Sequence, residues 1–230
     1  MTQVAMSSHN MNAIESYEGY LKMPLVQLHV RTSLIHLQNG KSILLSPHPS
    51  LTAEEFTRMG NVTDIVAPNL FHHLGIKKAV AALPKAKLWG VNGFDKKRKD
   101  LPWQNFVTDI SWPHHDELIA LPLDGIPKVN ECLFLHKPSK TLFVTDLCFN
   151  ILDSKGFGAW LIYSLFGTNQ RFATSKFFVR AVTDKAAFQA SLDKLFKHDF
   201  DNLVPCHGSV ITGNAKTLLR SALQERGFVV

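Results

Sequence analysis

The sequence has few cysteines and no long apolar run, and both absences exclude classes of protein. Its three cysteines, in 230 residues, show no CxxC spacing, which excludes a disulfide framework and a thiolate zinc cage. The longest strongly apolar stretch, residues 157–166, is much shorter than the roughly 20 residues that a transmembrane helix needs. Residues 1–20 are polar and lack the pattern of a secretory signal, so we predict a flexible N-terminus and a cytoplasmic location.

The charge pattern gives little support to a nucleic-acid partner. The net charge is +6, but the basic residues are scattered except at residues 96–99, a run typical of a solvated loop. No internal repeat, low-complexity tract or flexible linker divides the chain, and its 45% hydrophobic content is enough for a full core. We therefore predict a single domain over residues 1–230, with a helical insert at residues 152–180 and no membrane partner.

Apolar patterns and turn residues predict strands and helices in alternation. Gln38-Asn39-Gly40 separates two strand-like runs and predicts a hairpin, and Thr52 is placed as the N-cap of a helix. Strands are expected at residues 25–30, 33–37, 42–45, 62–67, 87–91, 117–121, 132–136, 141–145 and 201–205. Helices are expected at residues 52–59, 76–83, 215–224 and over much of 156–197. The order predicts an α/β fold, a four-layer αββα sandwich of two mixed β-sheets flanked by helices.

Three of the predicted strands lead into side chains that bind metals. Residues 62–67 precede His72-His73, residues 141–145 precede Asp146, and the last strand precedes His207. Imidazole and carboxylate groups satisfy zinc or iron(II), and a catalytic site needs about three protein ligands and an open position. These strand ends could therefore converge on one metal ion.

The order of these motifs resembles the metallo-β-lactamase superfamily, whose first motif reads T-H-x-H-x-D-H-x-G. The matching residues 67–75 read Ala-Pro-Asn-Leu-Phe-His-His-Leu-Gly. In that register His73 keeps the last histidine and His72 replaces the aspartate, whereas Pro68 and Leu70 replace the first two histidines. The loop at residues 124–128, which matches the family's central histidine motif, contains no histidine. The resemblance thus implies that the first of the two usual metal sites is lost.

The later motifs of the family are retained, which implies one residual site. Asp146 matches the bridging aspartate and His207 the histidine of the P-x-H-G motif. The resemblance implies that His73, Asp146 and His207 bind one divalent metal ion, zinc with iron or manganese as alternatives. His72 would be a fourth ligand or a base behind the ligands, and His72 and Asp146 are the predicted catalytic residues.

Two functions follow from this predicted site. The first is a metal-dependent hydrolase-like protein that acts on a small ester, lactone, thioester or amide, because a bound metal polarises a carbonyl and activates water. The second is a non-catalytic binding or scaffold module that has lost its metal site.

Several other residues compete for a role in the predicted site. His48 could line the pocket, and Glu131 could replace the lost central histidine as a ligand, although a salt bridge is favoured for it. His114 and His115 are expected in an exposed loop. Cys206 is expected in the core, because neighbouring residues at a strand end point in different directions.

Overall fold

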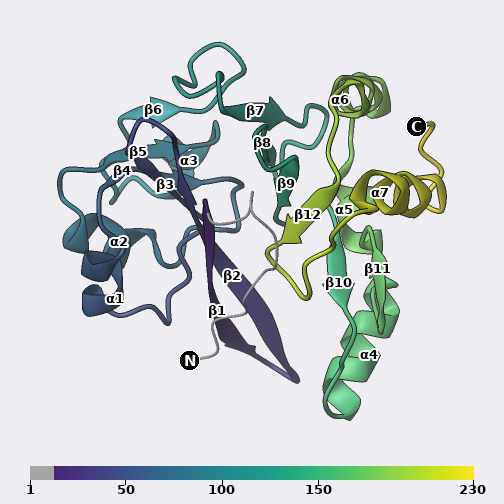
Figure 1. Cartoon of the computed structure of the whole chain (residues 1–230). Coiled ribbons are helices and arrows are strands. Elements are labelled where there is room, and N and C mark those ends of the chain that lie inside the picture. Colours follow the sequence, from purple (N-terminus) through teal and green to yellow (C-terminus); the bar gives the residue numbers. More distant parts are fainter. Residues whose placement is uncertain (1–12) are drawn as a thin grey trace.

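The computed structural model describes residues 13–230 and contains two mixed sheets that face each other (Figure 1). The larger sheet consists of β1 (Ile14–Met23), β2 (Val26–His36), β3 (Ser42–Leu45), β4 (Val62–Ala67), β5 (Lys87–Gly90) and β6 (Asn105–Phe106), in this order. The smaller sheet consists of β12 (Asn202–Pro205), β9 (Thr141–Val144), β8 (Cys132–His136) and β7 (Leu118–Pro122), in this order. A third sheet pairs β10 (Phe149–Ile151) with β11 (Arg171–Ala173).

Both main sheets combine parallel and antiparallel pairs. In the larger sheet β1, β2 and β3 are antiparallel neighbours, and β3 to β6 are parallel. In the smaller sheet β7, β8 and β9 are antiparallel, and β12 pairs in parallel with β9. The predicted two mixed sheets are therefore confirmed.

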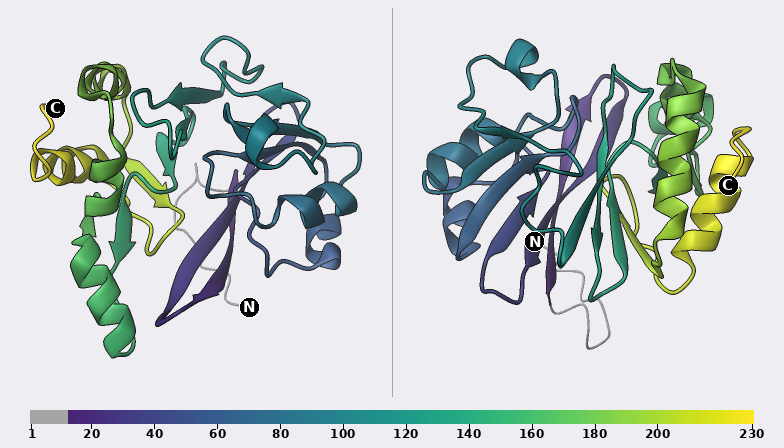
Figure 2. Two further views of the ribbon diagram at one scale, coloured as in Figure 1. Left: turned by 180° about the vertical axis from the view of Figure 1, so that it is seen from behind. Right: turned by 90° about the horizontal axis from the view of Figure 1, so that it is seen from above.

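Helices cover the outer face of each main sheet, which gives the layers seen in Figure 2. The larger sheet is covered by α1 (Ala53–Arg58), α2 (Ile76–Ala82) and α3 (Phe94–Lys97). The other half of the chain provides α4 (Phe157–Phe166), α5 (Lys176–Ala181), α6 (Lys185–Lys197) and α7 (Ala215–Gln224). Within residues 13–230, no helix is both long enough and apolar enough to cross a membrane.

Local sequence explains where α1 begins. The Thr52 side chain accepts the backbone N–H of Glu55, and the Glu55 carboxylate accepts the backbone N–H of Thr52, which forms a capping box. Phe56 then turns its fully buried ring toward the sheet. The helix thus begins directly after Thr52, the residue that the sequence predicted as its cap.

The main core lies between the two sheets and under the first helices. Leu34 and Ile43 of the larger sheet belong to the same buried cluster as Phe134 and Phe143 of the smaller sheet. A second cluster packs the other face of the smaller sheet against α5, α6 and α7. The apolar alternation of the strands therefore fixes which face of each sheet meets the other.

Three expectations require correction. The two strands predicted at residues 25–30 and 33–37 are replaced by one strand, β2, which spans residues 26–36. Residues 14–20 form most of β1, so the predicted flexible N-terminus does not extend over them; residues 1–12 lie outside the described residues. The predicted helical insert at residues 152–180 contains α4 and part of α5 but also the strand β11, which pairs with β10.

Candidate metal centre

The candidate site lies where two parallel strands end beside the loop that follows β4. β9 and β12 pair in parallel to their last residues, so the residues after them lie at the same edge of the smaller sheet. Asp146 follows β9 and His207 follows β12, while the loop after β4 carries His72. The structure therefore brings together His72, Asp146 and His207, from three segments far apart in the sequence.

Both imidazoles present Nε2 to the carboxylate of Asp146. His72 Nε2 lies 3.4 Å from Oδ2, and His207 Nε2 lies 3.4 Å from Oδ1. A hydrogen bond between such groups is usually about 2.7–2.9 Å long. Two ligands bound to zinc at about 2.0–2.1 Å with a tetrahedral angle are roughly 3.3 Å apart. Each separation is longer than such a hydrogen bond and close to the spacing of two metal ligands, and the two imidazoles face different oxygens of Asp146.

The other nitrogen of each imidazole is already bonded within the protein. His207 Nδ1 lies 2.7 Å from the backbone carbonyl of His29, which accepts the N–H, and the ring stacks on Phe149 with centroids 4.7 Å apart. His72 Nδ1 lies 2.7 Å from Ser46 Oγ. Metal-binding histidines commonly donate their second N–H in this way, which orients the ring and leaves Nε2 free.

The charges of the cluster reinforce one another. Burial acts to lower the pKa of His72. The charges of Cys206 and Asp146 outweigh this effect and raise the pKa well above its usual value. Burial acts to raise the pKa of Asp146, but His72 and His207 outweigh this effect and hold the pKa well below its usual range. The arrangement therefore favours a positive charge beside the Asp146 carboxylate.

Asn69 joins the His72 loop to the Asp146 loop, and the sequence analysis missed it. The Asn69 side chain is fully buried, and its Oδ1 accepts the backbone N–H groups of Phe71 and His72 at 2.8 and 2.9 Å. Its Nδ2 donates to Thr145 Oγ1 at 2.8 Å and to Asp146 Oδ2 at 2.6 Å. Every polar atom of this amide has a partner. The available signal was an asparagine two residues after a buried strand, where such side chains commonly bond the backbone of a turn.

Glu131 holds the backbone on the other side of Asp146. The buried carboxylate of Glu131 accepts the backbone N–H of Thr145 at 2.6 Å and that of Asp146 at 3.1 Å. Burial and the nearby Asp146 charge raise the pKa of Glu131 to about 7. The favoured salt bridge is thus not the observed role: the carboxylate fixes the turn that carries Asp146.

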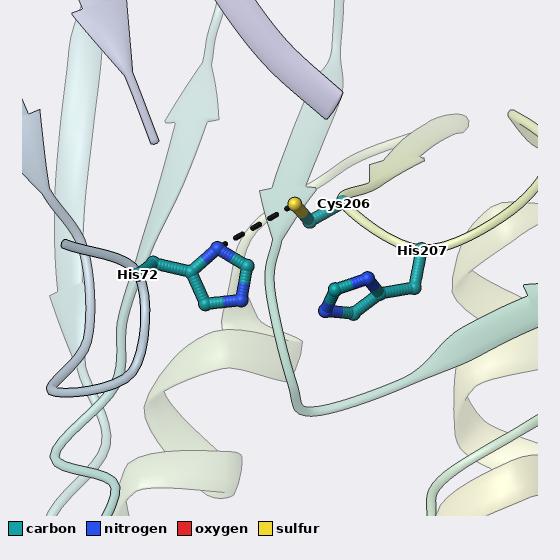
Figure 3. A group of neighbouring side chains, drawn as sticks. All are labelled: His72, Cys206 and His207. Carbon is teal, nitrogen blue, oxygen red and sulfur yellow. Dashed lines mark hydrogen bonds between the residues drawn. The ribbon is translucent and has the colours of Figure 1, made fainter. Parts of the chain in front are cut away.

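Cys206 lies inside the cluster, contrary to the prediction that it points away from His207. Among the described residues, His72, Cys206 and His207 form the one group of three whose ligand atoms lie within 4.8 Å of one another (Figure 3). Its Sγ is 3.5 Å from His72 Nδ1 and also contacts the backbone of Arg31. Burial acts to raise the pKa of the Cys206 thiol, but His72 and His207 outweigh this effect and lower the pKa to about 6. The strand has ended at Pro205, so the alternation of a strand no longer applies.

The structure does not bring His73 into this group. Its Nδ1 lies 2.8 Å from a guanidinium nitrogen of Arg98, and its ring packs edge-on against Phe94. Burial and the charges of Lys97 and Arg98 lower the pKa of His73 to about 4. Of the two adjacent histidines, His72 and not His73 therefore faces Asp146, the reverse of the roles that the resemblance implied.

The remaining candidate histidines lie elsewhere or in the wall of the cavity. His114 is buried, with its Nε2 3.1 Å from Asp64 Oδ2, which corrects the expectation of an exposed loop; His115 is half-buried. His48 lines the same cavity as His72, as anticipated, and its Nδ1 bonds Ser50 Oγ at 2.7 Å. Neither His114 nor His115 lines the cavity that contains the candidate ligands.

A cavity of about 460 Å³ opens onto the cluster. His72, Asp146 and His207 form part of its lining, together with side chains of the β1–β2 hairpin, α4 and α5. The volume lies in the range of small-molecule sites. A ligand in this cavity would reach the candidate metal ligands directly.

Comparisons with known proteins identify the fold. No family model and no curated protein sequence matches the chain. Among solved structures, a metallo-β-lactamase from Pontibacter korlensis is similar over 97% of this chain and 98% of that chain, with 13% identity and a TM-score of 0.67. A metallo-β-lactamase from Hirschia baltica is similar over 98% and 97%, with 12% identity and a TM-score of 0.64. The metallo-β-lactamase FIM-1 from Pseudomonas aeruginosa, in its mono-zinc form, is similar over 98% and 94%, with 12% identity and a TM-score of 0.63. The chain therefore has the metallo-β-lactamase fold, as predicted.

Proposed function

We propose that this protein is a metal-dependent hydrolase with one divalent ion, held by His72, Asp146 and His207. The observation that carries the proposal is the pair of 3.4 Å separations between imidazole Nε2 atoms and the Asp146 carboxylate. Because His207 Nδ1 donates to the His29 carbonyl, Nε2 of a neutral ring has a free lone pair. Two lone pairs that face each other across 3.4 Å repel, so each contact requires either a proton on the ring or a metal ion beside it.

The donor set indicates which ion would fit. Two imidazoles and a carboxylate suit zinc, iron(II) or manganese, and the thiol of Cys206 beside them favours zinc, since thiolates select softer ions. When bound, such an ion supplies Lewis acidity, which polarises a carbonyl oxygen and favours deprotonation of water. Asn69 then holds the Asp146 carboxylate and Glu131 holds the Asp146 backbone, while the His29 carbonyl and Ser46 orient the two rings.

The reaction class follows from this chemistry and from the fold. A polarised carbonyl and an activated water lead to hydrolysis of a small ester, lactone, thioester or amide. The structures of the same fold include a metallo-β-lactamase in a mono-zinc form, which supports a site with a single ion. We place Asp146 and His72 at the reacting centre, with His72 facing the carboxylate from the β4 loop.

Elemental analysis of purified protein tests the ligand assignment without a known substrate. We expect about one equivalent of metal in the wild type and loss of this metal in His72→Ala and His207→Ala. The matched control is His73→Ala, which removes the adjacent imidazole and leaves the three proposed ligands, and this variant should keep its metal. Circular dichroism verifies that each variant is folded.

Three results would contradict the proposal. Metal retained in His207→Ala, or metal lost in His73→Ala with His72→Ala unaffected, would show that the ion is bound elsewhere or by the other histidine. Absence of metal from the wild type after growth with zinc, iron and manganese would favour a non-catalytic binding module.

A further inference from the structure

The cavity beside the candidate metal ligands is almost entirely apolar away from them. Leu21 and Leu28 of the β1–β2 hairpin, Ile162 and Leu165 of α4, and Phe177 of α5 contribute to its wall. The hairpin and α4 lie side by side, as two views show (Figures 1 and 2). Val26 and Tyr163 fasten them in a small buried cluster of their own. The wall is therefore built from elements that pack against each other.

Charged side chains are scarce in this wall. Among the described residues that line the cavity, no lysine, arginine or glutamate is present, and the one carboxylate is that of Asp146. A substrate with a second charge away from the metal ligands would leave that charge without a partner and partly desolvated, which is costly. The wall therefore selects a ligand whose polar group lies at the candidate site and whose remainder is uncharged.

Exposed apolar side chains are concentrated at the same place. Of the 14 large apolar side chains that are exposed in the described part of the chain, six line this cavity: Met23, Phe71, Leu74, Leu165, Phe166 and Phe177. A contiguous exposed apolar surface commonly marks a binding site. These side chains would become buried when an apolar ligand enters.

We propose that the cavity binds an apolar acyl chain, and that the substrate is an acyl ester or thioester whose carbonyl lies against His72, Asp146 and His207. This inference rests on the proposed hydrolase function for the reaction, but the binding of the chain depends only on the wall. Hydrolysis forms a bond between water oxygen and the acyl carbon and breaks the acyl C–O or C–S bond. The leaving alcohol or thiol takes a proton from water and a fatty acid is released, so atoms balance without a further reactant. The fatty acid product would occupy the same cavity.

Calorimetric titration with saturated fatty acids from hexanoate to tetradecanoate, below their micellar concentrations, tests the chain site. Each methylene that enters the wall contributes roughly 0.8 kcal/mol, so we expect Kd to fall about fourfold per added CH₂ until the chain exceeds the cavity. Titrations are made with both metal-loaded and chelator-treated protein. Chain-length dependence in the chelator-treated protein supports the acyl site even if the hydrolase proposal fails.

Charge substitutions at exposed positions localise the chain without disturbing the core. Leu165→Asp and Phe177→Asp change side chains that line the cavity but are 64% and 48% exposed, so folding should be unaffected. Each should weaken binding of dodecanoate by roughly tenfold or more and that of hexanoate by less. The matched control is Phe157→Asp. Phe157 lies on α4 like Leu165 and is 76% exposed, but it is outside the cavity lining, so this variant should change Kd by less than about twofold.

Two outcomes would overturn the inference. One is a Kd that does not depend on chain length in folded, metal-loaded protein. This result would be compatible with the metal centre but would exclude the acyl-chain site. The other is equal weakening by Phe157→Asp and Leu165→Asp, which would show that the whole apolar face, and not the cavity, holds the fatty acid, as expected for a surface that binds a membrane or a protein.

Discussion

Asn69 offers a sharp test of how the candidate site is held together, because a change of one atom group reverses one of its bonds. In Asn69→Asp the shape of the side chain is kept, and Oδ1 can still accept the backbone N–H groups of Phe71 and His72. The group that donates to Asp146 at 2.6 Å becomes an oxygen, so two carboxylates face each other in a buried place. We expect the variant to fold but to be less stable by an amount that depends on pH.

The size of the effect follows from the response that costs the least free energy, which is uptake of one proton by the folded variant. A proton shared by the two carboxyl groups restores a hydrogen bond between them, and its cost at pH 7 is that of protonating a carboxyl of ordinary pKa, about 3.9. This cost is about 1.4 kcal/mol for each of about three pH units, or about 4 kcal/mol. The folded variant holds one more proton than the unfolded variant, so its stability falls as pH rises. The difference from wild type should therefore be small near pH 4 and about 4 kcal/mol at pH 7.

Urea denaturation between pH 4 and pH 7, with a chelator present so that metal binding does not contribute, measures this difference. The matched control is Asn61→Asp, in which an exposed amide loses one bond to the Gly40 carbonyl; it should cost about 1 kcal/mol or less, without the steep pH dependence. A difference for Asn69→Asp that stays constant from pH 4 to pH 7, or equals that of Asn61→Asp, would refute the bond between Asn69 and Asp146.

Two further predictions concern stability away from the metal ligands. Burial lowers the pKa of His48 to about 4, so the unfolded chain takes up a proton at His48 first as pH falls. Between pH 6.5 and pH 4 the free energy of unfolding of the wild type should therefore fall by up to about 3 kcal/mol more than that of His48→Asn. Parallel curves of unfolding free energy against pH would contradict this. Thr52→Ala should lower the free energy of unfolding by about 1 kcal/mol because it removes the capping box of α1, whereas Thr57→Ala, in the exposed helix interior, should cost much less, as measured by urea denaturation.

Elements with strong local signals could be predicted from the sequence. β8 and α7 have the predicted bounds, Cys132–His136 and Ala215–Gln224, because turn residues or caps flank a clear apolar pattern. β1 was missed because it is an edge strand with charged and half-exposed residues, and its register comes from pairing with β2 along its whole length. β11 was missed for a related reason: its three residues are a strand only because β10 lies beside them.

The candidate site was predictable as a convergence of strand ends but not in its details. Asp146 and His207 lie together because β9 and β12 are parallel neighbours; the sequence predicted that the strand ends converge, but not this pairing. The choice between His72 and His73 depends on the direction of one turn, which Asn69 sets through two backbone bonds. The inward direction of Cys206 depends on where β12 ends. Such directions follow from tertiary hydrogen bonds, and no local pattern encodes them.

The bond between His207 and the His29 carbonyl has a consequence for cooperativity. His29 belongs to the larger sheet and His207 follows the smaller one, and the same pairing is completed by the Gly208 N–H, which donates to His29 Nδ1 at 3.0 Å. His72 reaches the centre from the larger sheet, and Asp146 from the smaller one. An ion bound here would thus cross-link two halves of the chain, so local opening of either half would release it. The rate of metal loss to a chelator would then measure how fast the interface between the sheets opens.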